Sequence, residues 1–267
     1  MLYIVATPIG NLKDISHRAV EVLQRCDYIL CEDTRTSLTF LNAYNIDKKL
    51  VSYHKFNEAS KCKSIADDIR QGRDVALISD AGMPGISDPG AVIIRYLKAE
   101  GLPYTVIPGP SALINAFVLS GYDAPFTFVG FLPDKKKERN ELLTTLAQSL
   151  WPSIYYVSPH SIHEFFGNMY EVFGDREVCV VRELTKKFEE VSFTTLAEGY
   201  HGIVKGEFVC VVKGGDITNQ VVDDQMIVDE FKQLVDNGLT NKDAIKEICD
   251  KHRLKKNYVY NLSLKVK

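Results

Sequence analysis

Residues Val75 to Gly90 read VALISDAGMPGISDPG, an apolar run that passes directly into a segment of glycine, proline and aspartate. The run from Val75 to Ser79 is typical of a buried strand. The eleven residues after it hold three glycines, two prolines and two aspartates, a composition that ends a strand and keeps the chain in a turn. A helical pattern begins at Ala91. A strand, a loop and a helix in this order predict one unit of a parallel α/β sheet.

The same alternation of strand and helix extends to both sides of this stretch. Further strands are expected at Leu2 to Thr7, Tyr28 to Cys31, Leu50 to Tyr53 and Tyr104 to Ile107. Helices are expected after Asp14, Thr36 and Pro110 and over Asn57 to Arg70, with Asp14 as the cap of the first. Because strands that alternate with helices pair in parallel, we predict a parallel α/β domain with five strands over residues 1–120.

The rest of the sequence predicts two further units. Residues 121–217 are expected to form a second α/β domain with a mixed sheet, because its last three strands leave little room for helices between them. These strands are expected at Glu177 to Leu184, Glu190 to Leu196 and Glu207 to Val212. Residues 223–267 show three short helical segments joined by tight turns, which indicates a small unit that resembles a helix-turn-helix.

The composition is that of an ordinary globular protein. Of the 267 residues, 45% are hydrophobic and 25% are charged, and no apolar run reaches the roughly 18 residues of a membrane span. The six cysteines form no C-x-x-C pair, which gives a zinc ribbon no support and indicates reduced thiols in the cytoplasm. We therefore expect a cytoplasmic protein with no metal site and no membrane partner.

Charge is distributed unevenly along the chain. The net charge is -3, yet Thr240 to Lys267 holds eight Lys or Arg and three Asp or Glu, a local charge of +5. The basic tail of an acidic chain requires an explanation, because local charge indicates the sign of a partner better than net charge does.

Polar residues crowd the loops that follow the predicted strands, where ligands bind in open parallel sheets. Glu32, Asp33 and Arg35 follow a buried strand in CEDTRT, either as a helix start or as groups that act on a ligand. Asp80 and Asp88 offer acceptors for ligand hydroxyls or amines, and they lie among glycines that allow a backbone to approach a ligand. Ser111 begins a helix after PGPSA, where free N–H groups suit a carboxylate.

Two nucleotide-binding motifs are absent from the sequence. Gly85 and Gly90 have the spacing of a P-loop, but Ala91 and Val92 stand where its Lys and Ser or Thr belong. No strand is followed by GxGxxG. A Walker-type nucleotidase and a dinucleotide-binding fold are therefore disfavoured.

Eight segments, taken together and in order, resemble one family. TPIGNLKD, CEDTR, LISDAGMPGISDPG, VIPGPSA, FVGFLP, SPH, RELTKKFEE and KNYVYNLSL look like the 16S ribosomal RNA methyltransferases of the tetrapyrrole methylase superfamily. The resemblance covers nearly the whole chain. It implies two α/β domains with S-adenosylmethionine between them, methylation of the 2'-hydroxyl of a cytidine in 16S rRNA of the small ribosomal subunit, and a homodimer with no DNA partner.

The resemblance also assigns residues to the cofactor. They are Pro8, Asp80, Ala81, Gly82, Met83, Pro84, Ser111 and Ala112 from the first domain and Tyr156 and Ser158 from the second. Met83 stands where the family usually has Thr, and Val157 and Ser161 stand where it often has Glu and Arg. These departures concern contacts to cofactor or RNA and leave the reaction class unchanged.

Methyl transfer to a ribose hydroxyl calls for a proton acceptor and for a cation beside the substrate phosphate. Glu32, Asp33 and Glu183 are the candidate acceptors, Arg35 and Arg182 are the candidate phosphate partners, and the sequence does not choose among them. Further RNA phosphates are expected at basic residues, for which a solvated helix face is the alternative. These residues are Lys135, Lys136, Lys137, Arg139, Arg253, Lys255 and Lys256.

Three other functions stay open at this point. A porphyrinoid methylase or a diphthine-type methylase of the same superfamily shares the fold and cofactor but gives the basic C-terminal unit no role. A non-catalytic RNA-binding assembly factor explains that unit but does not need LISDAGMPGISDPG beside PGPSA.

Overall fold

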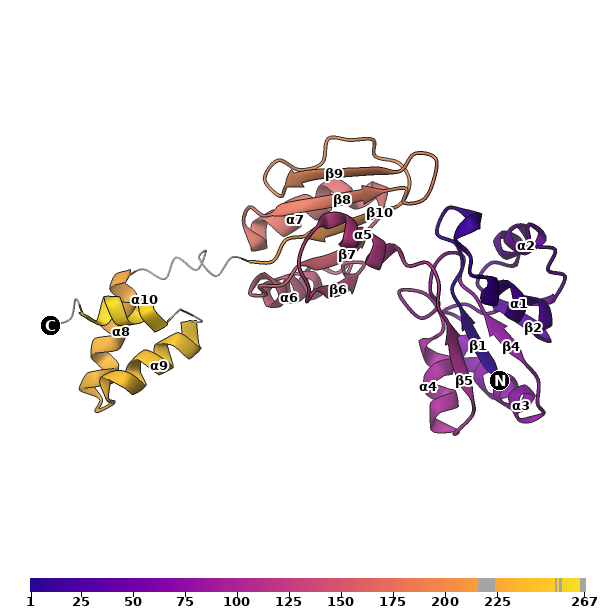
Figure 1. Ribbon diagram of the computed structural model, residues 1–267, viewed down its shortest axis with the longest axis horizontal. Helices are drawn as coiled ribbons and strands as arrows, with labels where there is room; N and C mark the ends of the chain where they lie inside the picture. The colour runs from indigo at the N-terminus through magenta and orange to yellow at the C-terminus, as the bar shows by residue number, and fades with distance from the viewer. Residues whose placement is uncertain (216–223, 253, 255, 265–267) are drawn as a thin grey trace. The chain divides into compact units, whose positions relative to one another are not determined.

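The computed structural model describes residues 1–215, 224–252, 254 and 256–264 (Figure 1). The chain divides into two compact units. The larger unit holds Met1–Ala147 and Trp151–Lys213, and the smaller holds Gln148–Leu150 and Gly214–Lys267. No helix among the described residues is long and apolar enough to cross a membrane.

The first sheet of the larger unit is parallel throughout. Its strands are β1 (Leu2–Val5), β2 (Tyr28–Cys31), β3 (Lys49–Ser52), β4 (Val75–Leu77) and β5 (Tyr104–Ile107), in the order β3-β2-β4-β1-β5. Leu2 pairs with Val75 on one side and with Tyr104 on the other. All the loops that follow these strands therefore meet at one edge of the sheet.

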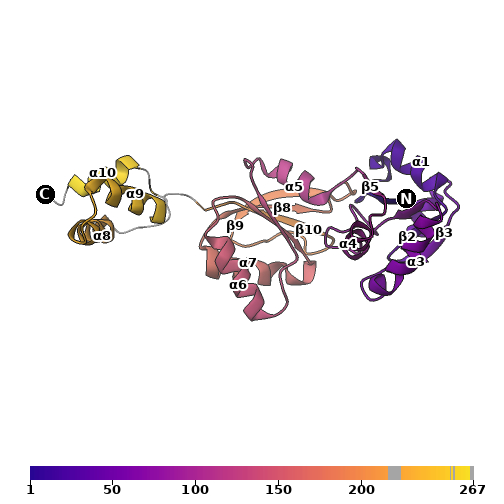
Figure 2. The same ribbon diagram turned by 90° about the horizontal axis from the view of Figure 1, so that it is seen from below.

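Helices cover both faces of the first sheet. They are α1 (His17–Arg25), α2 (Thr34–Asn42), α3 (Glu58–Arg70) and α4 (Ala91–Ala99). Alternate residues of β2 enter different cores: Leu30 packs with residues of α3 and α4, and Ile29 packs with residues of α1. Figure 2 shows α1 and α3 on opposite sides of β2 and β3. Each fully buried Leu or Ile contributes about 1.5–3 kcal/mol through loss of contact with water.

The second sheet of the larger unit is mixed. Its strands are β6 (Thr127–Gly130), β7 (Ser153–Val157), β8 (Glu177–Arg182), β9 (Glu190–Thr195) and β10 (Phe208–Val212), in the order β6-β7-β10-β8-β9. Only β6 and β7 pair in parallel among these described strands; the other three pairs are antiparallel. One face packs against α6 (Lys136–Ala147) and α7 (Ile162–Phe173), and the other packs against α5 (Ala112–Ser120).

The smaller unit has a core of its own. Its helices are α8 (Asp224–Asp236), α9 (Asn241–His252) and α10 (Lys256–Ser263). Ile227 and Phe231 of α8 pack with Ile248 of α9 and Val259 of α10, all buried. Three amphipathic helices therefore fold around one small apolar cluster.

The fold class predicted from the sequence is confirmed: a parallel first sheet, a mixed second sheet and a helical C-terminal unit. The division at residues 120 and 217 stays a prediction. One detail of the prediction is wrong. Asp14 ends a short 3₁₀ helix, and the cap of α1 is Ser16, whose hydroxyl accepts a hydrogen bond from the N–H of Ala19 at 3.2 Å. Ser is an N-cap as favourable as Asp, so the sequence pattern fits either residue.

Candidate functional site

The loop that follows β4 is tied to the loop that follows β1 by backbone hydrogen bonds. The N–H of Thr7 donates to the carbonyl of Gly82 at 2.9 Å, and the N–H of Gly82 donates to the carbonyl of Thr7 at 3.1 Å. The Thr7 hydroxyl donates to the carbonyl of Ser79 at 3.2 Å. Gly82 has a φ of +77°, a left-handed conformation that favours glycine. These contacts fix the shape of the loop without help from a ligand.

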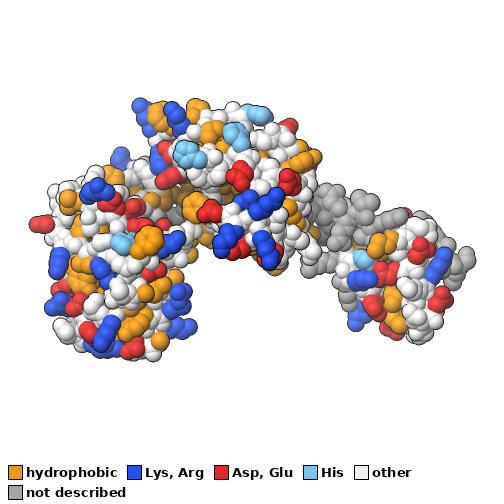
Figure 3. All heavy atoms as spheres, turned by 180° about the vertical axis from the view of Figure 1, so that it is seen from behind, with side chains coloured by type: hydrophobic (Ala, Val, Ile, Leu, Met, Phe, Trp, Pro, Cys, Tyr) orange, Lys and Arg blue, Asp and Glu red, His pale blue; other side chains and the backbone are white. Residues whose placement is uncertain are grey.

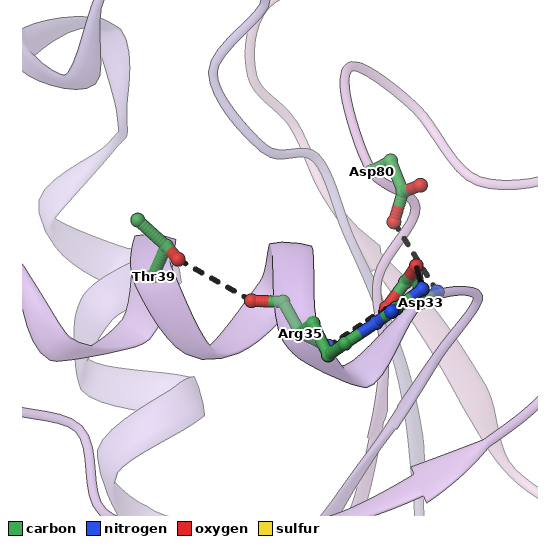
Figure 4. Close-up of polar contacts among 4 residues, drawn as sticks. All are labelled: Asp33, Arg35, Thr39 and Asp80. Atoms are coloured by element: carbon green, nitrogen blue, oxygen red, sulfur yellow. Dashed lines mark hydrogen bonds and ion pairs between the residues drawn. The ribbon is translucent and has the colours of Figure 1, made fainter.

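The loop that follows β2 is organised by Asp33, the N-cap of α2. Its carboxylate accepts a hydrogen bond from the N–H of Arg35 at 2.8 Å. The Arg35 guanidinium turns back toward the same carboxylate, with 3.1 Å between Nη2 and Oδ2, and it holds the pKa of Asp33 below its usual range (Figure 4). The ion pair offsets the unfavourable position of a cation in the first turn of a helix.

A cavity of about 500 Å³ lies between these loops and the second sheet, in the size range of small-molecule sites. We call it the first cavity. Its lining from the first-sheet loops is Ile9, Glu32, Asp80, Ala81, Gly82, Met83, Ile86, Ser87 and Asp88, followed by Ser111 and Ala112 at the start of α5. Its lining from the second-sheet region is Phe131, Tyr156, Val157, Ser158, Pro159, Val181, Leu184, Gly206, Glu207, Phe208 and Val209.

Three carboxyl groups give the first cavity a strongly acidic side. Burial raises the pKa of Glu32, and the nearby Asp80 raises it further. Partial burial raises the pKa of Asp80 as well. Burial, together with Glu32, raises the pKa of Asp88 to about 6. Because each carboxylate makes ionisation of the next less favourable, a cationic group is favoured in this part of the cavity.

Hydrogen-bond donors gather at the start of α5. Ser111 is the N-cap of this helix, yet its hydroxyl makes no capping hydrogen bond. The N–H groups of a first helical turn have no partner within the helix, so they suit an anionic group. Tyr156 of β7 lines the same cavity, and burial and the nearby Asp88 raise its pKa to about 12. Its phenol therefore stays protonated and can donate a hydrogen bond.

Arg182 and Glu183 stand between Val181 and Leu184 in the chain but do not line the first cavity as those two residues do. The Arg182 side chain is 8% exposed, and its Nε and Nη2 donate to Glu190 Oε2 at 3.0 and 2.7 Å. Glu183 Oε1 accepts from Lys186 Nζ at 2.8 Å, and Lys186 lowers the pKa of this carboxyl. Gly206 has a φ of +90°, and a Cβ at this position would collide with the Glu183 carboxyl. Both charged groups are therefore engaged in holding this part of the second sheet together.

A second cavity, of about 640 Å³, shares Glu32 and Asp80 with the first. Its other lining residues are Asp33, Thr34 and Arg35 at the start of α2 and Ser52, His54, Lys55 and Phe56 after β3. Glu32 therefore lies where the two cavities meet. No group of three His, Cys, Asp or Glu side chains within the described part of the chain could hold a metal ion.

Comparison with known proteins assigns this arrangement to a family. The family model described as Tetrapyrrole (Corrin/Porphyrin) Methylases matches residues 1–199. The chain belongs to the tetrapyrrole methylase family. Methylases of this family transfer the methyl group of S-adenosylmethionine.

Curated relatives of this tetrapyrrole methylase carry the name ribosomal RNA small subunit methyltransferase I. The protein from Halalkalibacterium halodurans is 38% identical over 98% of this chain and 93% of its own length. The protein from Mycoplasmopsis pulmonis is 49% identical over 79% of this chain and 96% of its own length. Among solved structures, that of the methyltransferase CobJ has a TM-score of 0.62 at 15% identity, and the match covers 80% of this chain and 94% of that one. This last likeness establishes the shared fold alone.

The first cavity fits the cofactor of tetrapyrrole methylases. S-adenosylmethionine carries a sulfonium and an ammonium group, which suit the acidic side formed by Asp80 and its neighbours. Its carboxylate suits the N–H groups that Ser111 leaves uncapped. Its adenine ring suits apolar walls such as Ile9, Leu184 and Phe208. Each group of the cofactor thus has a part of the cavity lining with complementary charge or polarity.

The structure brings most of the predicted cofactor residues of this tetrapyrrole methylase together. Pro8 and Pro84 are buried nearby and do not line the first cavity. The residues that do line it are Asp80, Ala81, Gly82, Met83, Ser111, Ala112, Tyr156 and Ser158. Of the predicted catalytic residues, Glu32 lines both cavities and Asp33 and Arg35 line the second, whereas Arg182 and Glu183 line neither.

The predicted RNA-binding residues of the larger unit line neither cavity. Lys135 pairs with Glu138 at 2.8 Å, Lys137 reaches Glu141 at 4.0 Å, and Lys136 is exposed. Arg139 is 12% exposed and lies 3.2 Å from Glu164. Lys256 is exposed at the start of α10, and Arg253 and Lys255 lie outside the described residues. In the view of Figure 3, Lys and Arg side chains lie among Asp and Glu side chains.

Several residues at the two cavities are absent from the predicted set. Asp88 was expected to offer an acceptor to a ligand but was not assigned to the cofactor or to catalysis, and it has the most strongly raised carboxyl pKa among the described residues. Phe131 and the segment 206–209 reach the first cavity through strand pairing far along the chain, which no local pattern reveals. Phe56 lines the second cavity, although an aromatic residue before a helix is more typical of a core.

Proposed function

We propose that this chain transfers the methyl group of S-adenosylmethionine to the 2'-hydroxyl of a cytidine in 16S rRNA of the small ribosomal subunit. Family membership carries the methyl transfer and the cofactor. The observation that carries the substrate is similarity over 98% of the chain to a protein named ribosomal RNA small subunit methyltransferase I. The target atom follows from the resemblance of the eight sequence segments.

Residues of the first cavity hold the cofactor in this proposal. When bound, S-adenosylmethionine supplies an electrophilic methyl group. The N–H groups at Ser111 and Ala112 bind its carboxylate, Asp80 attracts its positive charge, and the fixed backbone at Gly82 lets the ligand approach closely. Because these groups are in place beforehand, binding costs little rearrangement.

Glu32 is the proton acceptor that the geometry supports best. The other candidates are engaged: Asp33 caps α2 and binds Arg35, and Glu183 binds Lys186. These contacts lower the pKa of Asp33 and of Glu183, which makes both carboxylates weaker bases. Glu32 has a raised pKa and lies where the two cavities meet, so its carboxylate can take the hydroxyl proton while the acceptor oxygen faces the first cavity.

A homodimer and a cytoplasmic location belong to the same proposal. The exposed apolar side chains of α5 support a second copy of this chain as partner: Val118 is 72% exposed, and Ile114 and Leu119 are also open to solvent. The edge strand β5 leaves Val106 exposed as well. Apolar side chains in such number favour burial against another surface. In analytical sedimentation we expect the parent protein to be a dimer and Val118→Asp to be a monomer. A parent protein that sediments as a monomer would contradict the dimer.

The test of the proposed reaction uses purified protein, labelled S-adenosylmethionine and small ribosomal subunits from cells that lack this enzyme. We expect label in 16S rRNA and none in subunits that already carry the modification. Calorimetry with S-adenosylmethionine separates the possible failures. Cofactor binding without transfer to subunits or free 16S rRNA overturns the substrate, and absence of cofactor binding overturns the assignment to the first cavity.

A further inference from the structure

Phe56 is a large aromatic side chain held in solvent by a hydrogen-bonded loop between β3 and α3. It is 90% exposed. The N–H of His54 donates to Asn57 Oδ1 at 2.9 Å, the N–H of Phe56 donates to His54 Nδ1 at 3.3 Å, and the N–H of Asn57 donates to the His54 carbonyl at 2.9 Å. The backbone on both sides of Phe56 is therefore fixed, and the loop presents the ring to solvent. Such a ring gains free energy only when a partner covers it.

The groups around Phe56 differ in character. Phe56 lines the second cavity together with Arg35 and Lys55, both exposed cations. The same cavity contains the carboxyl groups of Glu32 and Asp80, which it shares with the first cavity. An aromatic ring, cations and carboxylates in one hollow match the three parts of a nucleotide: a base that stacks, a phosphate that needs positive charge, and ribose hydroxyls that donate hydrogen bonds.

We propose that the second cavity binds a nucleotide of the substrate RNA, with its base stacked on Phe56, its phosphate at Arg35 or Lys55 and its ribose toward Glu32. This inference rests on the proposed function, because that function supplies RNA as the substrate. It assigns the acceptor to a cavity distinct from the one that fits the cofactor. Glu32, common to both, is then the point at which ribose and methyl group come together.

The carboxylates of the second cavity favour the base and ribose of one nucleotide over several consecutive phosphates of an RNA backbone. Glu32, Asp33 and Asp80 repel an extended phosphate backbone, so only the side of the cavity with Arg35 and Lys55 suits a phosphate. An apolar protein segment would cover Phe56 but leave these five charged groups facing it, at a cost in desolvation. A protein partner is therefore the less favourable occupant, and it gives a different result in the tests below.

The first test measures stacking without catalysis. Trp151 is the only tryptophan in the sequence, so Phe56→Trp in a Trp151→Phe background places a single fluorophore in the second cavity. A filter-binding assay first gives the concentration of free 16S rRNA that saturates the protein. We expect RNA at this concentration to quench the emission of the tryptophan at position 56. The parent protein with Trp151 alone is the control and should change little. Unchanged emission from Trp at position 56 under saturating RNA, or no RNA binding, overturns the nucleotide site.

The second test separates RNA from cofactor in the kinetics. Stacking of one base on an aromatic side chain corresponds to about a 5- to 150-fold change in affinity. We expect Phe56→Ala to raise KM for small subunits by an amount in that range and to leave the Kd of S-adenosylmethionine unchanged. Phe56→Tyr, which keeps the ring, should stay within about threefold of the parent. Phe193→Ala removes another exposed ring, 56% exposed on β9 and outside both cavities, and serves as the matched control.

The two tests distinguish failure of this inference from failure of the proposed function. If the parent methylates subunits while Phe56→Ala behaves like Phe193→Ala, the nucleotide site is wrong and the function stands. If RNA quenches Trp at position 56 while the parent methylates no ribosomal RNA, the nucleotide site stands and the proposed substrate or reaction is wrong. Loss of RNA binding in Phe193→Ala as large as in Phe56→Ala also overturns the site.

Discussion

The carboxylate of Asp80 accepts a hydrogen bond from the backbone N–H of Asp33, with 3.4 Å between Oδ1 and N. Asp80 follows β4 and Asp33 follows β2, two strands that are neighbours in the first sheet. The bond therefore joins the loop of the first cavity to the loop of the second. It gives one side chain influence over both candidate binding sites.

Replacement of this side chain should affect both substrates. We expect Asp80→Ala to weaken binding of S-adenosylmethionine and to raise KM for subunits, each by about 10-fold or more, because hydrogen bonds to charged groups contribute about 1.5–3 kcal/mol. Calorimetry and steady-state kinetics measure the two effects. Asp47→Ala, an exposed carboxylate outside both cavities, is the matched control. A variant with unchanged cofactor affinity would show that Asp80 has no part in the first cavity.

Glu32→Gln tests the proton acceptor. General bases contribute about 10²- to 10⁴-fold to rate, so we expect kcat at saturating cofactor to fall by at least the lower figure. Glu183→Gln should remain within a few-fold of the parent, because its carboxylate is engaged with Lys186. If both variants and Asp33→Asn keep near-parental kcat, no carboxylate acts as base and positioning alone accounts for the rate.

The pH profile gives an independent test of Glu32. A base must be ionised to accept a proton, and burial and Asp80 raise the pKa of Glu32. The kcat of the parent should therefore decline as pH falls through that raised pKa, above the usual range of a Glu. In Glu32→Gln this decline should be absent. If kcat declines at the same pH and by the same factor in both proteins, the decline reports the titration of a group other than Glu32.

Asp88 should make the protein less stable as pH rises. Its pKa in the folded state is raised to about 6, so the folded chain binds protons more tightly than the unfolded chain. The free energy of unfolding then falls as pH increases from about 4 through 6. We expect Asp88→Asn to melt at a higher temperature than the parent at pH 7.5, by about 2–4 °C for each kcal/mol gained, and the difference to vanish near pH 4. Equal melting temperatures at pH 7.5 would refute the raised pKa.

The basic residues of α6 and of the turn before it should divide into two kinds. Lys135, Lys136 and Lys137 are exposed, so their joint replacement by Ala is expected to weaken RNA binding. The slope of log K against log salt should also become shallower, by up to about 0.9 for each phosphate that the protein no longer neutralises. The Arg139 side chain is 12% exposed and pairs with Glu164, so Arg139→Ala should lower the melting temperature instead. An unchanged salt slope in the triple variant would remove this surface from the RNA interface.

A truncation that tests the C-terminal unit has to remove all three of its helices, because they share one apolar core. Deletion from Thr240 onward would leave Ile227 and Phe231 of α8 without the helices that cover them. Truncation after Lys213 removes these helices together. We expect this truncation to weaken RNA affinity and flatten its salt dependence while cofactor affinity is kept, because it removes the eight Lys or Arg between Thr240 and Lys267. The six Asp or Glu and one Lys of residues 214–239 make the removed segment neutral overall, so the expected effect comes from the local basic stretch and not from net charge. A parental salt slope would show that the unit does not contact RNA.

Local sequence patterns predict the strands of this fold well where apolar runs have sharp ends. Tyr28–Cys31 and Tyr104–Ile107 have the bounds expected for strands, because turn-forming or polar residues follow directly. The partner of α5 could not be predicted in this way. The apolar residues of this helix indicate a buried face, but only the assembled structure shows that Leu113 and Ala116 pack against the second sheet.

The candidate site was predictable to the extent that topology fixes it. Asp80 and Glu32 follow parallel strands, so the sheet itself brings them to one edge. Arg182 looked equally suitable in sequence, but it is buried, and pairing of β8 with β9 places Glu190 beside its guanidinium. The proposed role of Phe56 depends on the exposure of its side chain. This exposure could not be predicted, because Phe residues are usually buried.

Methylation of a ribose hydroxyl is the reaction proposed for this protein, and alkaline hydrolysis distinguishes it from methylation of a base. A 2'-hydroxyl is the nucleophile that cleaves RNA in alkali, so a methylated ribose leaves one gap in the hydrolysis ladder. We predict that 16S rRNA from treated small subunits shows a single new gap, at a cytidine, only with S-adenosylmethionine and not with Glu32→Gln at matched times. Incorporated methyl label with an uninterrupted ladder would place the methyl group on a base and contradict the proposed reaction.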